Sequence, residues 1–182
     1  MCGGRGTRLD AEVEKPLFEV GGEPMVARVA DALAESRIET AYAAVSPHAP
    51  ETREFAAASD DLTTVETPGE GYVEDLGTAL EAVEPPVLTV AADLPLLAGD
   101  AIDSVLDAHD EGSLTVCVPV ALKRALGASA DTTFKRDGRE LAPTGVNVVA
   151  DADRETAHET YDARFAVNVN RRADAELAEE LL

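Results

Sequence analysis

The sequence predicts a single α/β domain with three layers, in which helices cover both faces of a mostly parallel β-sheet. Apolar segments of strand length alternate with amphipathic segments of helical length along the whole chain. This alternation is typical of strand–helix–strand units with parallel strands. The 182 residues, 45% of them apolar, are enough for one full hydrophobic core and too few for two comfortable ones. We therefore expect one domain over residues 1–182.

The first half of the chain supplies regularly spaced elements. A helix is predicted to start at Pro24 and to run to residue 36, because proline suits a first helical turn and the apolar residues that follow share one face. Next come a buried strand over 40–45, a helix over 50–59, a weaker strand over 62–67 and a helix over 73–83.

The second half opens with a continuous apolar run over 86–92, which a double proline and an acid enclose. Such a run is typical of a strand covered on both faces. An Asp137-Gly138 pair between two short alternating stretches indicates a hairpin. The other predicted elements are a helix over 98–110, strands over 114–122, 145–150 and 165–170, and a closing helix over 172–182.

The net charge of −21 is unusual, with 36 acidic against 15 basic residues and lysines only at 15, 123 and 135. The acids are spread along the chain, unlike the local acidic tail of a disordered segment. In molar salt the Debye length falls to about 3 Å, so self-repulsion is screened. We interpret the composition as a halophilic surface, and the lack of a basic stripe argues against nucleic acid as a partner.

Other classes of protein are disfavoured by the composition. No apolar run approaches the roughly 18 residues of a membrane span, and the N-terminus lacks a secretory pattern. Two cysteines give no disulfide framework, and no cysteine–histidine cluster suggests zinc. We treat the three histidines (His48, His109 and His158) as bystanders and expect a cytoplasmic protein.

Several polar or glycine-rich stretches follow predicted strands. In an open parallel sheet, ligands bind at the carboxyl ends of the strands. Four stretches fall at such ends: 3–8, 46–51, 92–97, and the asparagine pair Asn168 and Asn170. Their convergence predicts a ligand site at this edge of the sheet.

The glycine-rich loop GGRGTR has the chemistry of a phosphate site. Gly3, Gly4 and Gly6 let the backbone adopt positive φ, so that successive N–H groups can face phosphate oxygens. Arg5 and Arg8 add side-chain donors in a chain that has few cations. The spacing GGRGTRL-x5-KPL is neither a Walker loop nor a dinucleotide-binding loop.

This motif, with the EKPLFEVGGEPMVARVADAL that follows it, resembles the nucleotidyltransferases that load a nucleoside monophosphate onto a phosphorylated acceptor. The resemblance implies a nucleotide-diphospho-sugar transferase-like, Rossmann-like fold. It also implies that the loop, with Thr7 and Lys15, holds a triphosphate. Asp93 in VAADLPLL and an asparagine of VNVNRR would bind Mg²⁺, with Mn²⁺ as an alternative, and by position Asn170 is preferred over Asn168. The implied catalytic residues are Arg5, Arg8, Lys15 and Asp93. Helix capping by Asp93 and a turn-forming role for the asparagines are the alternatives.

Within this family two subgroups compete. TPGEGYVEDLGTAL (67–80) and PTGVNVV (143–149) resemble the archaeal GTP:adenosylcobinamide-phosphate guanylyltransferases more than the molybdenum-cofactor guanylyltransferases. The resemblance implies transfer of GMP from GTP to a phosphorylated corrinoid. A non-catalytic nucleotide-binding module is the alternative from another class, and a homodimer stays open.

The remaining site predictions concern the two substrates. Glycines let backbone groups reach a guanine edge, so Pro68, Gly69 and Gly71 are assigned to nucleotide binding. Tyr72, Glu74, Asp75 and Asn147 are assigned to the acceptor side, with helix capping as the alternative for the first three.

Family members place about five apolar residues before the glycine loop, forming an interior strand. In this sequence Met1 stands where that strand should end. The expectation is that the natural protein carries a further apolar segment upstream of Met1, because each such buried side chain contributes about 1.5–3 kcal/mol.

Overall fold

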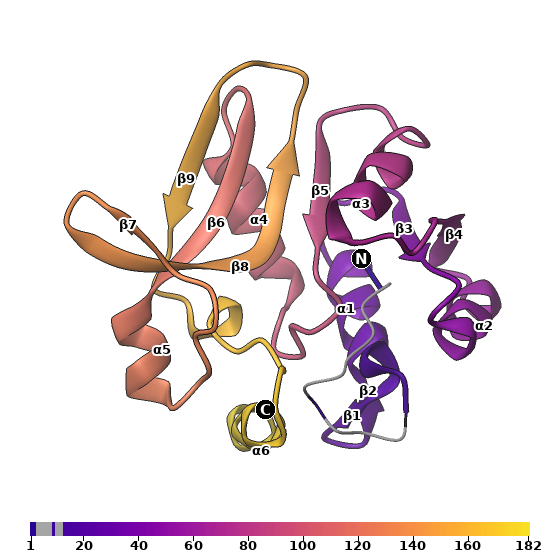
Figure 1. The fold of residues 1–182 in the computed structure, drawn as a ribbon, viewed down its shortest axis with the longest axis horizontal. Helices are drawn as coiled ribbons and strands as arrows, with labels where there is room; N and C mark the ends of the chain where they lie inside the picture. The colour runs from indigo at the N-terminus through magenta and orange to yellow at the C-terminus, as the bar shows by residue number, and fades with distance from the viewer. Residues whose placement is uncertain (3–8, 10–12) are drawn as a thin grey trace.

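The computed structural model describes residues 1–2, 9 and 13–182 (Figure 1). The helices are α1 (Met25–Ala34), α2 (Pro50–Ala58), α3 (Tyr72–Leu80), α4 (Gly99–Ala108), α5 (Val120–Leu126) and α6 (Arg172–Leu181), with short 3-10 helices η1 (Lys15–Leu17) and η2 (Ala163–Phe165). The main strands are β3 (Ala41–Val45), β4 (Leu62–Glu66), β5 (Val87–Val90), β6 (Ser113–Pro119), β8 (Arg139–Val149) and β9 (Glu155–Glu159). The small hairpin β1 (Glu19–Val20) and β2 (Glu23–Pro24) and the short strand β7 (Phe134–Arg136) complete the set.

The strands form a mixed, largely parallel arrangement. β3 and β4 are parallel, and so are β6 and β9. β8 runs antiparallel to both β5 and β6, so these last two strands share one direction. The order in the larger sheet is β5-β8-β6-β9, with β7 beside β8. Consequently the carboxyl ends of β3, β4 and β5 can serve one common site.

Met1 and Cys2 lie between the β3-β4 sheet and the larger sheet and connect the two. The amino group of Met1 donates a hydrogen bond to the Val90 carbonyl oxygen at 2.9 Å, and the Met1 carbonyl accepts one from the Ala92 N–H at 3.4 Å. On the other side, the Cys2 N–H donates to the Ala44 carbonyl at 2.9 Å. This is the hydrogen-bond pattern of a parallel strand, in which Met1 stands opposite Ala91.

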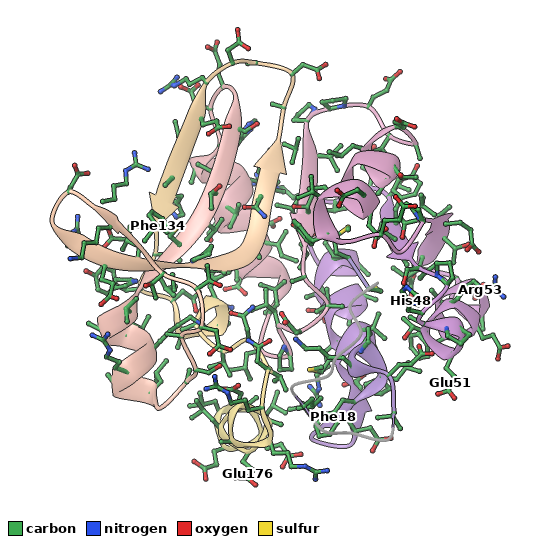
Figure 2. The ribbon with its side chains drawn as sticks, viewed as in Figure 1. Phe18, His48, Glu51, Arg53, Phe134 and Glu176 are labelled. Carbon is green, nitrogen blue, oxygen red and sulfur yellow. The ribbon has the colours of Figure 1, made fainter. Side chains whose placement is uncertain are left out.

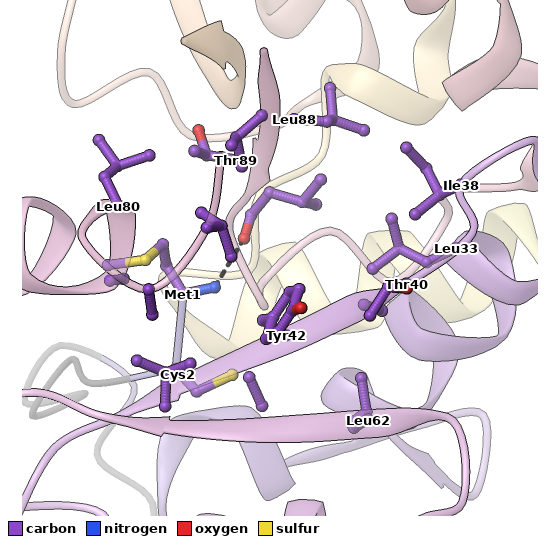
Figure 3. Close-up of a pocket in the computed structure, with 18 of the residues that line it drawn as sticks. Met1, Cys2, Leu33, Ile38, Thr40, Tyr42, Leu62, Leu80, Leu88 and Thr89 are labelled. Carbon is purple, nitrogen blue, oxygen red and sulfur yellow. Dashed lines mark hydrogen bonds between the residues drawn. The ribbon is translucent and has the colours of Figure 1, made fainter. Parts of the chain in front are cut away.

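Beyond Met1, a cavity of about 790 Å³ continues between β3 and β5 (Figure 3). Its walls include Val26 and Val29 from α1 on one side and Leu76 and Leu80 from α3 on the other. The helices α1 and α3 therefore cover opposite faces of the sheet at this point, which gives the three predicted layers.

Two core clusters position the site. In the larger one, α1 and α4 pack on β5, β6 and β8 through fully buried residues such as Ile102, Val116 and Val146. In the second, the segment after η2 packs on α6 through Val167, Val169 and neighbouring apolar residues. Charged side chains such as Glu51 on α2 and Glu176 on α6 point outward (Figure 2). Among the described residues, no helix is long and apolar enough to cross a membrane.

Most predicted elements are confirmed, including the hairpin, where Asp137 and Gly138 both have the positive φ that such a turn requires. The strand predicted over 165–170 is wrong: the chain leaves η2 as an irregular segment, and the Val169 N–H donates to the Asp93 carbonyl at 2.9 Å. The strand predicted over 114–122 ends at Pro119, and residues 120–122 open α5 instead. Residues 145–149 belong to the longer antiparallel strand β8, which ends at Val149, and β9 was not predicted.

Candidate functional site

The carboxyl ends of β3, β4 and β5 open on a cavity of about 410 Å³. Its lining combines residues from two of the four stretches at predicted strand ends, 46–51 and 92–97, with the KPL motif and the loop after β4. They include Lys15, Pro16, His48, Gly69, Gly71, Tyr72, Asp75 and Asp93. The stretches 46–51 and 92–97 therefore meet at this edge of the sheet, and Asn170 joins them through Lys15, whereas the stretch 3–8 lies outside the described residues.

Lys15, Asp93 and Asn170 meet at one edge of this cavity. The Lys15 ammonium donates to Asp93 Oδ2 at 2.6 Å and to Asn170 Oδ1 at 2.9 Å. The Lys15 and Asp93 side chains are each 18% exposed, so solvent still reaches them. Three segments that are distant in sequence thus place a cation and two oxygen acceptors within hydrogen-bonding distance.

This arrangement fits a divalent cation. A carboxylate oxygen and an amide oxygen already converge on one positive charge, the Lys15 ammonium, which acts here as a stand-in cation. Mg²⁺ is held by few protein oxygens and keeps several waters. Within residues 1–2, 9 and 13–182, no group of three or more histidine, cysteine or acidic residues could hold a metal. A site of two protein oxygens plus water and phosphate suits Mg²⁺ better than a closed protein cage.

Asn168 lies on the other side of Asp93. Its Nδ2 donates to Asp93 Oδ1 at 3.0 Å and to the Thr144 carbonyl at 2.8 Å, and its Oδ1 accepts from Lys123 at 3.2 Å. The amide oxygen therefore faces Lys123 and not the Lys15 ammonium. Of the two asparagines assigned to metal, Asn170 has the oxygen that points to the shared cation.

Asp174 fixes the chain at Asn170. Its Oδ2 accepts hydrogen bonds from the Asn170 N–H at 3.1 Å and the Arg171 N–H at 2.9 Å, at the start of α6. Its carboxylate also accepts from the N–H and hydroxyl groups of Ser129. The side chain is only 2% exposed. This buried cap holds the Asn170 backbone in place, and the sequence analysis did not assign it a role.

The loop after β4 is held by its own side chains. The Gly69 N–H donates to Asp75 Oδ1 at 2.7 Å, and the His48 Nε2 lies 3.2 Å from the Gly69 carbonyl oxygen. Gly69 has φ of 74°, and an added Cβ would lie 3.1 Å from the His48 ring, so glycine is required there. His48 and Asp75 therefore shape this wall of the cavity. The sequence analysis expected backbone groups here to contact guanine, but the Gly69 N–H donates its hydrogen bond to Asp75.

The residues assigned to the acceptor occupy different places. Tyr72 is 54% exposed on the cavity wall, and partial burial raises the pKa of its hydroxyl, against a smaller lowering by Thr89. Asn147 Nδ2 reaches the same Thr89 hydroxyl at 3.4 Å from β8. Glu74 is exposed and Asp75 is buried in the loop. Asn147 thus contacts Thr89 on β5, Tyr72 lines the cavity, and Asp75 faces the loop.

Some predictions lie outside the described residues. They concern Gly3, Gly4, Arg5, Gly6, Thr7 and Arg8. Pro68 is described and exposed, next to Gly69 in the loop.

Comparison with known proteins extends over the whole chain. The family of MobA-like NTP transferase domains matches residues 1–135. The adenosylcobinamide-phosphate guanylyltransferase of Methanocaldococcus jannaschii is 31% identical over 195 aligned residues, which span 100% of this chain and 95% of the relative. The bifunctional protein GlmU of Synechococcus elongatus is 26% identical over 60% of this chain and 25% of its own length.

Solved structures support the fold. A putative glucose-1-phosphate thymidylyltransferase from Bacillus anthracis superposes with a TM-score of 0.70 at 14% identity, over 99% of this chain and 92% of that one. A CMP:2-keto-3-deoxy-manno-octonic acid synthetase gives 0.66 at 13% identity, over 95% and 93%. At these identities the likeness concerns the fold alone. The family match and the full-length relative establish that the chain is a nucleotidyltransferase and belongs to the family of MobA-like NTP transferase domains.

Proposed function

We propose that this protein transfers GMP from GTP to adenosylcobinamide phosphate and releases pyrophosphate. The observation that carries the reaction type is the meeting of Lys15, Asp93 and Asn170 at the edge of a 410 Å³ cavity. The choice of substrates rests on the full-length similarity to an archaeal adenosylcobinamide-phosphate guanylyltransferase. A cytoplasm rich in salt accords with the net charge of −21.

The reaction needs positioning and charge neutralisation more than proton transfer. An oxygen of the acceptor phosphate attacks the α-phosphorus of GTP, a new P–O–P bond forms, and the bond to the departing pyrophosphate breaks. The acceptor phosphate is already an anion near neutral pH, so no general base has to remove a proton. Enzymes of phosphoryl-group chemistry gain most of their rate from such placement and electrostatics.

The described residues divide these tasks. Asp93 Oδ2 and Asn170 Oδ1 would hold Mg²⁺, which supplies positive charge to the phosphates when it is bound. Lys15 then has phosphate oxygens as its partners and stabilises the charge on pyrophosphate. His48 and Asp75 hold the loop at Gly69, which is proposed to contact the base. Arg5, Arg8 and the glycines before Leu9 are proposed to hold the triphosphate.

The test is transfer of label from α-labelled GTP, with Mg²⁺ in molar KCl, to adenosylcobinamide phosphate and molybdopterin offered in parallel. ATP, CTP and UTP serve as donor controls. Asp93→Ala is the inactive reference, and Lys135→Met, which removes an exposed lysine on β7, is the matched control. Label on the cobinamide alone is expected. Label on molybdopterin would change the acceptor, and folded protein that labels neither would favour a binding module.

A further inference from the structure

Lys123 is a buried cation that the proposed reaction does not use directly. It lies on α5 and is only 3% exposed. Its Nζ donates to the Ala166 carbonyl at 2.8 Å and to Asn168 Oδ1 at 3.2 Å. Among the described residues, both of these partners are neutral oxygens. Burying an ammonium group against neutral partners costs free energy, so a specific benefit is expected elsewhere.

The benefit follows from the chemistry of the two side chains. A lysine ammonium can only donate hydrogen bonds, whereas an asparagine amide has one accepting and one donating end. Lys123 therefore fixes the Asn168 oxygen toward itself and turns the Asn168 Nδ2 toward Asp93 Oδ1. The opposite amide orientation would set the Asn168 oxygen against the Asp93 carboxylate and leave Lys123 without this acceptor. All polar atoms of the Asn168 amide are used in the observed orientation, because the second Nδ2 hydrogen bond goes to Thr144.

We propose that Lys123 is a positioning residue for the Asp93 carboxylate and acts on it through the Asn168 amide. Asn168 holds Oδ1 of Asp93, and Oδ2 is thereby directed toward the Lys15 ammonium, which also donates to the Asn170 amide oxygen. This role rests on the proposed function only in that Asp93 binds a divalent cation. It also gives Asn168 a task other than metal ligation. Partners that orient metal ligands from behind change metal affinity by about 10- to 100-fold when they are removed.

A second effect of Lys123 would act in the opposite direction. Its positive charge lies near Asp93, and burial lowers the pKa of the Lys123 ammonium while the charges of Asp174 and Asp93 raise it. If charge were the main contribution, removing Lys123 would make the site more negative and strengthen cation binding. If orientation is the main contribution, the same change weakens it. The sign of the effect therefore separates the two explanations.

The experiment is titration of Mn²⁺ into the full chain without nucleotide, followed by electron paramagnetic resonance, with thermal unfolding measured for each variant. Lys123→Met removes both the charge and the hydrogen-bond donor, whereas Lys123→Gln removes the charge and keeps a donor. Asn168→Leu removes the amide at similar volume, and Lys135→Met is the surface control. Asp93→Asn identifies the binding that depends on this carboxylate.

We expect Lys123→Met to weaken the Asp93-dependent Mn²⁺ affinity by about 10- to 100-fold. Lys123→Gln should weaken it less, and Lys123→Met/Asn168→Leu should lose no more than the worse single variant. Unchanged or tighter Mn²⁺ binding in folded Lys123→Met would overturn the proposal, as would wild-type protein without Asp93-dependent binding. If Lys123→Met does not fold, Asn168→Leu carries the same test. Absence of GMP transfer with intact, Lys123-dependent Mn²⁺ binding would refute the proposed function alone.

Discussion

Lys15 offers the sharpest prediction, because its two proposed tasks respond in opposite directions to one change. In the described structure its ammonium occupies the pair of oxygens assigned to the cation, at 2.6 Å from Asp93 Oδ2 and 2.9 Å from Asn170 Oδ1. A divalent cation has to displace it. Lys15→Met removes this competitor and keeps a side chain of similar length.

The magnitude follows from the hydrogen bonds that are lost. A hydrogen bond to a charged group contributes about 1.5–3 kcal/mol, and the pair is partly exposed, so the lower value applies. About 1.4 kcal/mol corresponds to a tenfold change in affinity, so Lys15→Met should bind Mn²⁺ about tenfold more tightly than the wild type without nucleotide. GMP transfer should nevertheless slow by about 10²–10³-fold, because a donor to the developing charge on phosphate is missing.

The assay combines Mn²⁺ titration by electron paramagnetic resonance with transfer of label from GTP, and Lys135→Met again serves as the control. Weaker Mn²⁺ binding in Lys15→Met would refute the view that the ammonium and the cation share the Asp93 and Asn170 oxygens. An unchanged transfer rate would refute the role of Lys15 at the phosphates.

Three further predictions concern the loop, the fold and the pH dependence of stability. Asp75→Ala removes the acceptor of the Gly69 N–H and should raise the KM for GTP about tenfold with a smaller change in kcat, whereas Asp75→Asn, which keeps an acceptor, should be milder. About four apolar residues added before Met1 should fill the 790 Å³ cavity, raise the free energy of unfolding by about 3 kcal/mol and raise the Tm by about 6–12 °C, and a polar extension of equal length should not. Partial burial opposes ionisation of Asp162, but hydrogen bonds from Arg164 outweigh it and lower its pKa, so this carboxylate stabilises the fold above its ordinary pKa and the contribution is lost as the pH falls through the lowered value. Asp162→Asn should therefore reduce the free energy of unfolding by about 1 kcal/mol at pH 7, and denaturant titrations should show the difference shrinking below about pH 4.

Elements with strong local signals could be predicted from the sequence. The helix after Pro24 and the strand over 86–92 were predicted because apolar periodicity and proline punctuation act locally. The segment 165–170 has the same alternation as a strand, yet it pairs with no strand in the part of the chain that the structure describes. Val167 and Val169 point into a core made with α6, and the Val169 N–H bonds Asp93. Strand pairing depends on tertiary contacts, so the alternating pattern alone could not show that this segment stays irregular.

The same distinction holds for the candidate site. Lys15, Asp93 and Asn170 stand in motifs that sequence resemblance identifies, and the fold brings them together. Lys123 and Asp174 stand in no such motif. The hydrogen bonds from Lys123 to Ala166 and from Ser129 to Asp174 each join residues more than forty positions apart. The sequence held one indication for Lys123, since the chain has only three lysines. Its burial on α5 could not be predicted, because the strand predicted to run to residue 122 ends at Pro119 and the helix starts there instead.

The most direct test of the account is a crystal structure of the protein with Mn²⁺ and a non-hydrolysable GTP analogue, with the metal located by its anomalous scattering. The account predicts Mn²⁺ bound by Asp93 and the Asn170 amide oxygen, with the Lys15 ammonium moved onto phosphate oxygens. The Asn168 amide should remain between Lys123 and Asp93. Metal bound by Asn168, or a triphosphate and metal located away from Asp93, would contradict it.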